Sequence, residues 1–162
     1  MTFEGAIKMQ FGEEVQISDQ QLVSCGPYSN GCKGGFMTTA WHYQRLNGVV
    51  SAADYPYTSG ATRSPGECAI PEDAQWINYK PIYRDLIRKS PDMIKRALIE
   101  DGPIATALSV RGTPGFMSYS GGILRNVSTQ YLDHAMIIVG YTKDAWILQN
   151  SWGPGWGDGG RM

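Results

Sequence analysis

The chain has 162 residues, of which 42% are hydrophobic and 18% are charged. This is enough apolar material for one ordinary domain or for two small lobes. Basic and acidic residues number 14 and 15 and give a formal net charge of −1, without the basic excess of a nucleic-acid-binding protein. The longest strictly apolar run covers only residues 135–139, so we expect no helix that spans a membrane.

The first half of the chain predicts helices joined by loops. Apolar residues at helical spacing predict a helix that ends near Phe11. Ser18 and Gln21 have the spacing of a capping box, which predicts a second helix whose Gln21 side chain reaches back to Ser18. Residues 25–35 predict a loop, residues 36–47 a third helix, and residues 48–75 an ordered loop.

The second half changes character after one further helix. Ser90 followed by Pro91 predicts the start of that helix, which ends at the Gly102-Pro103 pair. Residues 104–110, 132–141 and 146–149 are strand-like runs separated by turn residues. The order predicts an α+β fold, with a helical lobe over residues 1–75 and an antiparallel sheet lobe over residues 76–162.

Two histidines are candidates for chemistry. His42 lies inside the third predicted helix and is interpreted as a packed or surface residue. His134 follows Asp133 at the start of an apolar strand, and the turn after that strand leads back towards Asn150. A bulge or a slightly different loop places Asn150 opposite His134, where an amide oxygen can fix an imidazole tautomer. A purely structural histidine is the alternative.

The three cysteines Cys25, Cys32 and Cys68 are an odd number, so one of them is free or lacks its partner. None opens a helix after a strand, where the helix dipole favours a thiolate, and disulfides are the better interpretation for at least two. No Cys or His spacing predicts a metal site, and no cofactor is expected. Residues 155–160 match G-x-G-x-x-G but lack the helix and strand that a dinucleotide site needs.

Five segments in series resemble the papain family of cysteine peptidases, to which the cathepsins belong. They are SDQQLVSC (residues 18–25), GCKGG (31–35), YPY (55–57), DHA with VGY (133–141), and NSWG with GWG (150–157). The resemblance covers nearly the whole chain. It implies a two-lobed fold, in which a substrate cleft separates a mainly helical lobe from an antiparallel sheet that closes towards a barrel.

The resemblance also implies roles for single residues. His134 matches the catalytic imidazole, Asn150 the amide that orients it, and Trp152 the indole that shields that pair from water. Positions that resemble the family's substrate-binding residues are Gly34, Gly35, Phe36, Met37, Leu132, Asp133 and Ala135. The two glycines leave bare backbone for an extended peptide, and the apolar members favour an apolar substrate side chain. Cys25 is expected to pair with Cys68, and Cys32 to be unpaired.

The family's nucleophilic cysteine matches no residue of this chain and is expected before Met1, so the fold is expected to be incomplete at both ends. Without a nucleophile, the chain alone should show no useful peptidase activity. Three explanations stay open: a fragment or processed chain of an active enzyme, a non-catalytic relative that binds peptides or proteins, and a structural subunit of an assembly.

The expected partners are a peptide or protein substrate and a second chain or N-terminal segment that carries the cysteine. The expected location is the secretory pathway, lysosome-like or extracellular, because disulfides persist there. The glycosylation sequon at Asn126 is consistent with that location. The first residues include neither a basic n-region nor an apolar h-region, so we expect no signal peptide within this chain.

Overall fold

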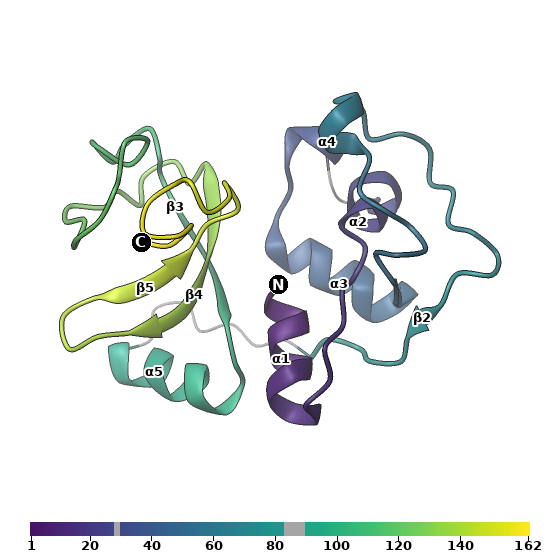
Figure 1. Ribbon diagram of the computed structural model, residues 1–162, viewed down its shortest axis with the longest axis horizontal. Helices are drawn as coiled ribbons and strands as arrows, with labels where there is room; N and C mark the ends of the chain where they lie inside the picture. The colour runs from purple at the N-terminus through teal and green to yellow at the C-terminus, as the bar shows by residue number, and fades with distance from the viewer. Residues whose placement is uncertain (28–29, 83–89) are drawn as a thin grey trace. The chain divides into compact units, whose positions relative to one another are not determined.

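The computed structural model describes residues 1–27, 30–82 and 90–162, which form two units (Figure 1). The helical unit comprises Gln10–Asp85. The sheet unit comprises Leu86–Met162 together with Met1–Met9 and contains a three-stranded sheet. The chain is therefore α+β, as the order of helical and strand-like segments predicts.

The division between the units differs from the expected one after residue 75. Strand β2 (Trp76–Ile77) pairs antiparallel with β1 (Val49–Val50), which ties residues 76 and 77 to the helical unit. Helix α1 (Thr2–Phe11) ends where the sequence predicts, but most of it belongs to the sheet unit. There Gly5 lies against Pro103, so closely that an added Cβ would come within 2.7 Å of the proline ring.

The helical unit begins with a capped helix. This helix is α2 (Asp19–Cys25), and it is followed by the 3-10 helix η1 (Gly31–Lys33), α3 (Met37–Asn47) and α4 (Ser59–Thr62). Ser18 Oγ accepts the Gln21 N–H at 3.0 Å, so the predicted cap of α2 is confirmed. The predicted return bond is wrong. Gln21 instead turns to β1, where its side chain accepts the Val50 N–H at 2.9 Å and donates to the Gly48 carbonyl at 3.2 Å.

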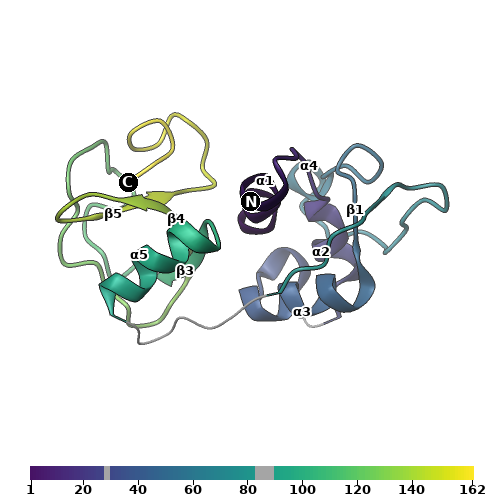
Figure 2. The same ribbon diagram turned by 90° about the horizontal axis from the view of Figure 1, so that it is seen from below.

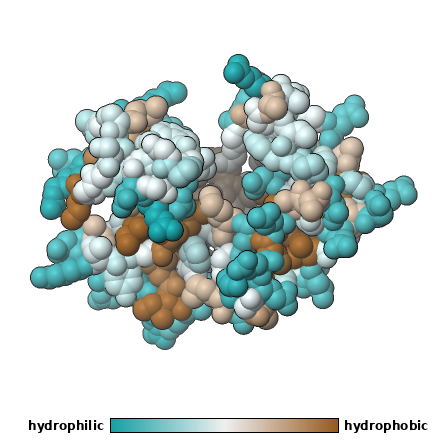
Figure 3. All heavy atoms as spheres, in the orientation of Figure 1, coloured by the Kyte–Doolittle hydropathy of each residue, from teal (hydrophilic) through white to brown (hydrophobic). Residues whose placement is uncertain are grey.

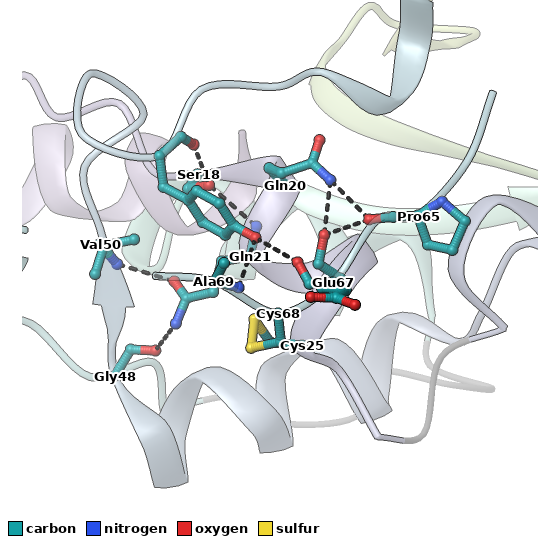
Figure 4. Close-up of a disulfide and its surroundings, with 12 residues drawn as sticks. Ser18, Gln20, Gln21, Cys25, Gly48, Val50, Pro65, Glu67, Cys68 and Ala69 are labelled. Carbon is teal, nitrogen blue, oxygen red and sulfur yellow. Dashed lines mark hydrogen bonds between the residues drawn. A yellow bond between two sulfur atoms is a disulfide. The ribbon is translucent and has the colours of Figure 1, made fainter. Parts of the chain in front are cut away.

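The predicted ordered loop after α3 is held by buried polar groups and a disulfide (Figure 4). Gln20 is 3% exposed. Its Oε1 accepts the Thr58 N–H at 2.8 Å, and its Nε2 donates to the Pro65 carbonyl at 3.1 Å. The disulfide between Cys25 and Cys68 joins the end of α2 to the same loop. Paired amides of this kind order a segment that has no hydrophobic periodicity.

The sheet unit has helix α5 (Pro91–Glu100) and strands β3 (Ile104–Leu108), β4 (His134–Tyr141) and β5 (Trp146–Gln149). The order is β3-β4-β5, with β4 antiparallel to both neighbours. Helix α5 is capped by Ser90, as predicted, and packs against β4 (Figure 2). Strands β3 and β4 are shorter than the predicted runs because the chain leaves the sheet at Ser109, which pairs with Ser128 in the connecting loop.

A bulge in β4 sets the register that the site depends on. Tyr141 pairs with Trp146 and Gly140 with Ile147, as for a two-residue turn, but Ile138 pairs with Leu148. The extra residue between them bends the strand and shifts the pairing by one position. Continued along the strands, the shifted register places Asn150 opposite Met136, two residues from His134 on the same face of β4, rather than opposite His134 itself.

Apolar side chains close the core of the sheet unit. Phe116 is fully buried and packs with three other buried residues, namely Leu108, Met136 and Trp156. On the face shown in Figure 3, hydrophobic atoms (brown) are interspersed with hydrophilic atoms (teal) over each unit. Within the described ranges, no helix combines the length and apolar character needed to cross a bilayer.

Candidate active site

The first residue of β4 and the residue after β5 bring their side chains together. His134 Nε2 lies 2.9 Å from Asn150 Oδ1. Asn150 is 3% exposed, whereas His134 is half-buried at the end of its strand. The sheet therefore joins two of the residues that the sequence singles out, although 16 positions separate them.

The amide oxygen of Asn150 determines the tautomer of the imidazole. Oδ1 also accepts the Ser151 backbone N–H at 2.8 Å, which identifies the atom near His134 as the oxygen. Because an amide oxygen only accepts, the imidazole must donate from Nε2. In the neutral ring, the lone pair is then on Nδ1, the nitrogen that can receive a proton.

An aromatic cluster surrounds this pair. The ring centroids of His134 and Trp152 lie 4.8 Å apart, with 40° between the planes. Phe116 meets His134 edge-on at 5.7 Å and Trp152 edge-on at 5.5 Å. Trp156 supports the cluster from behind and donates its indole N–H to the Phe116 carbonyl at 3.2 Å. These rings reduce the access of water to one side of the imidazole, which strengthens its hydrogen bond.

Asp133 binds the loop after β3. Its Oδ1 accepts the Val110 N–H at 2.7 Å, and its Oδ2 lies 3.7 Å from the Arg111 guanidinium. The carboxylate thus joins the turn after β3 to the start of β4, one residue before His134. Its neighbours Leu132 and Ala135 are exposed, and the predicted role of all three in substrate binding stays a prediction.

Gly34, Gly35 and Phe36 line a pocket of about 170 Å³ in the helical unit. Its other walls come from α2, the loop after α2, η1 and the first turn of α3, through Leu22, Val23, Gly26, Gly31, Thr39 and Ala40. Gly34 has φ +99°, which favours glycine, and an added Cβ there would meet nothing within 4 Å. Phe36 is 78% exposed. Open backbone beside an exposed ring is compatible with peptide binding. Met37 opens α3 and does not line the pocket.

The three cysteines differ in whether they form a disulfide. Cys25 and Cys68 form the disulfide that the resemblance implies, and Cys32 is free and exposed on η1. His42, interpreted as a packed or surface helix residue, is exposed on α3. Within residues 1–27, 30–82 and 90–162, no group of three or more His, Cys, Asp or Glu side chains is arranged to hold a metal ion.

Sequence reasoning missed Phe116 and Gln149. Phe116 lies in a Pro- and Gly-rich loop without periodicity. The one feature that could have indicated its burial is that it is a large apolar residue among small and polar ones. Gln149 ends β5, and its Nε2 donates to the Asn150 carbonyl at 2.9 Å. No sequence pattern predicts that contact, since it depends on how the chain folds back after Trp156.

One titrating group borders the aromatic cluster. Tyr119 packs against Trp156, with ring centroids 5.5 Å apart and the planes tilted by 41°, and donates its hydroxyl to the Gly122 carbonyl at 2.6 Å. Burial raises the pKa of the Tyr119 phenol, and the negative charge of Asp158 raises it further.

Comparison with known proteins identifies the family. The family model described as papain family cysteine protease matches residues 1–162. Ananain of Ananas comosus is 35% identical over 98% of this chain and 45% of its own length. Cathepsin K of Gallus gallus is 35% identical over 97% of this chain and 47% of its own length. Mexicain of Jacaratia mexicana is 33% identical over 98% of this chain and 72% of its own length.

Solved structures agree with these sequence relatives. A cysteine protease of Carica candamarcensis in complex with E-64 gives a TM-score of 0.81 at 28% identity, over 99% of this chain and 73% of that one. Procathepsin L 3 of Tenebrio molitor gives a TM-score of 0.81 at 30% identity, over 99% of this chain and 53% of that one. The chain spans about a third to a half of the length of most of the curated relatives named in this comparison, such as a cysteine proteinase of Theileria parva at 35%. The chain belongs to the papain family of cysteine proteases.

Proposed function

We propose that this chain is part of a cysteine-type peptidase that hydrolyses peptide bonds by a Cys-His-Asn arrangement, of which it carries His134 and Asn150. The observation that supports the proposal is the 2.9 Å contact between His134 Nε2 and Asn150 Oδ1 beneath Trp152. It leaves Nδ1 as the proton acceptor of the neutral ring. A thiol placed at Nδ1 would lose its proton to the imidazole and attack a peptide carbonyl.

The same imidazole would complete the cycle. After the thiolate attacks, the protonated ring gives its proton to the leaving amine, and an acyl-enzyme forms. Water deprotonated by the ring then releases the acid product. Asn150 would keep the ring in one orientation throughout, and Trp152 would limit exchange of the ring N–H with water.

The partners in this proposal are an extended peptide or protein substrate and a thiol from another segment or chain. The sheet unit contains no cysteine, and Cys25 and Cys68 are bridged in the helical unit. The disulfide and the exposed sequon at Asn126 support an oxidising compartment, such as a lysosome-like or extracellular one.

A chimera tests the proposal. The stretch of mexicain that precedes its match with this chain would be fused before Met1, and cleavage of fluorogenic peptides would be measured. The chain alone should give no turnover, and the chimera should cleave substrates with an apolar side chain two residues before the cut. His134→Ala in the chimera should lower kcat/KM by roughly 10³-fold or more. His42→Ala, at an exposed position of α3, is the matched control. A chimera as active with His134→Ala as without it would refute the proposal.

A second candidate is a peptide-binding subunit without hydrolysis. The open backbone at Gly34 and the pocket beside it favour this candidate. Titration calorimetry of the chain with peptides that are apolar at alternate positions would distinguish the two. This candidate is supported if the native protein binds such peptides and no chain that co-purifies with it carries a reactive thiol.

A further inference from the structure

The side chain of Gln149 joins two backbone carbonyls behind the candidate active site. Its Nε2 donates to the Asn150 carbonyl at 2.9 Å and to the Gly160 carbonyl at 3.0 Å. The Gly160 carbonyl also accepts the Asn150 N–H at 2.9 Å. The backbone N–H and carbonyl of Asn150 are thus both linked to Gly160, the first directly and the second through the Gln149 side chain, just after β5 ends.

Arg161 fixes which end of the Gln149 amide faces these carbonyls. Arg161 Nε donates to Gln149 Oε1 at 3.1 Å, and residues 149 and 161 form an antiparallel bridge. The two ends of a side-chain amide have nearly the same shape, so hydrogen-bond partners decide its orientation. With the oxygen held by Arg161, the nitrogen must face the two carbonyls.

The Asn150 side chain depends on this backbone support. Its Oδ1 accepts from Ser151 and His134, but its Nδ2 is buried and has no hydrogen-bond partner among the described residues. An amide that is hydrogen-bonded only through its oxygen has fewer fixed contacts than one that is bonded at both ends. Its position is therefore set by the backbone of Asn150, which Gln149 and Gly160 hold from behind.

The backbone at Gly160 packs closely against the Gln149 side chain. It has φ +88°, and an added Cβ would lie 3.1 Å from both Gln149 Nε2 and the Gly153 carbonyl oxygen. The space beside the Gln149 amide is thus closed, and a water molecule has little room to replace the amide if the side chain is shortened.

We propose that Gln149, oriented by Arg161, is a positioning residue that keeps Asn150 Oδ1 aimed at His134 and thereby selects the Nε2–H tautomer of the imidazole. The inference rests on the proposed function for its significance, because that tautomer presents Nδ1 to the thiol. The contacts themselves lie within the sheet unit and are independent of any nucleophile.

The test measures the tautomer directly in the whole chain. Nitrogen-15 NMR of the labelled His134 ring reports which nitrogen carries the proton at a pH where the ring is neutral. Gln149→Met removes the donor at nearly constant length, and Gln149→Lys keeps a donor for the two carbonyls. We expect Gln149→Met to shift the tautomer ratio towards Nδ1–H by roughly fivefold or more, as loss of one hydrogen bond predicts, and Gln149→Lys to restore it.

Gln130→Met is the matched control, since Gln130 is exposed in the same unit, and it should leave the ratio unchanged. If Gln149→Met unfolds the sheet, Arg161→Met supplies the same test, with a smaller shift in the same direction. An unchanged ratio in a folded Gln149→Met or Arg161→Met chain overturns the inference, as does a failure of Gln149→Lys to restore the ratio. Because no turnover is measured, that result leaves the proposed peptidase function to its own test with His134→Ala.

Discussion

The ring centroids of the Trp152 indole and the His134 imidazole lie 4.8 Å apart, while Trp152 itself is 40% exposed. Its inner face covers the imidazole and touches Phe116 and Trp156 at the edge, and the remainder faces solvent. The proposed shielding of the hydrogen bond between His134 and Asn150 therefore rests on a side chain that is only partly buried.

Trp152→Ala is expected to expose that hydrogen bond. Exchange of the His134 Nε2 proton with water should rise by roughly tenfold, because opening the bond no longer requires the indole to move. The free energy of unfolding should fall by only about 1–2 kcal/mol, less than for a buried tryptophan, since the ring is partly solvated. NMR exchange and denaturant unfolding measure the two effects. Trp76→Ala, in the helical unit, is the control, and equal exchange rates in both variants would contradict the shielding role.

Gln21 supplies a second prediction, on the stability of the helical unit. It is 1% exposed and satisfies the Val50 N–H and the Gly48 carbonyl. Gln21→Met fills the space but leaves the buried Val50 N–H and the partly buried Gly48 carbonyl unpaired, which should cost about 3 kcal/mol. Loss of hydrogen-exchange protection at the Val50 amide would report it. Gln16→Met, at an exposed position, should have no such effect, and full protection of Val50 in Gln21→Met would refute the assignment.

The disulfide supplies a third prediction. Cys25 and Cys68 are 43 residues apart, and closing a loop of that length is expected to stabilise the fold by about 4 kcal/mol through the unfolded chain. The double substitution Cys25→Ser with Cys68→Ser should lower the stability of the helical unit by up to that amount. In denaturant, thiol titration should find Cys32 alone before reduction and all 3 cysteines after it. More than one reactive thiol before reduction would show that the pair is not bridged.

The parts of this structure that local chemistry decides could be predicted from the sequence. The caps at Ser18 and Ser90, and strand β5, follow from residues within one turn or one alternation. The sequence also indicated that a bulge or a different loop would bring His134 and Asn150 together, but not which of the two, nor where it lies. Long-range partners could not be predicted: Gln21 bonds to residues 48 and 50, at the start of β1, rather than to its own helix start, because only the folded chain places these two backbone groups beside it.

The site shows the same limit. His134 and Asn150 follow from a hairpin and a resemblance, so sequence reasoning could find them. Phe116 and Gln149 act through contacts with residues 40 and 11 positions away, at Trp156 and Gly160. Such contacts depend on how loops without periodicity pack, and no local pattern encodes them.

Tyr119 gives a prediction about pH. Because burial and Asp158 raise its pKa in the folded chain above the ordinary value of 10.0, the unfolded chain releases this proton first as the pH rises. The stabilisation linked to the protonated phenol is therefore complete below pH 10.0 and is lost as the pH rises through the folded pKa. Asp158→Asn should lower the pKa of Tyr119 only in part, because burial is the larger cause. NMR titration of labelled tyrosines, assigned with Tyr119→Phe, measures this shift. Tyr119→Phe should also flatten the decline of stability at high pH, and an unchanged decline would show that another group is responsible.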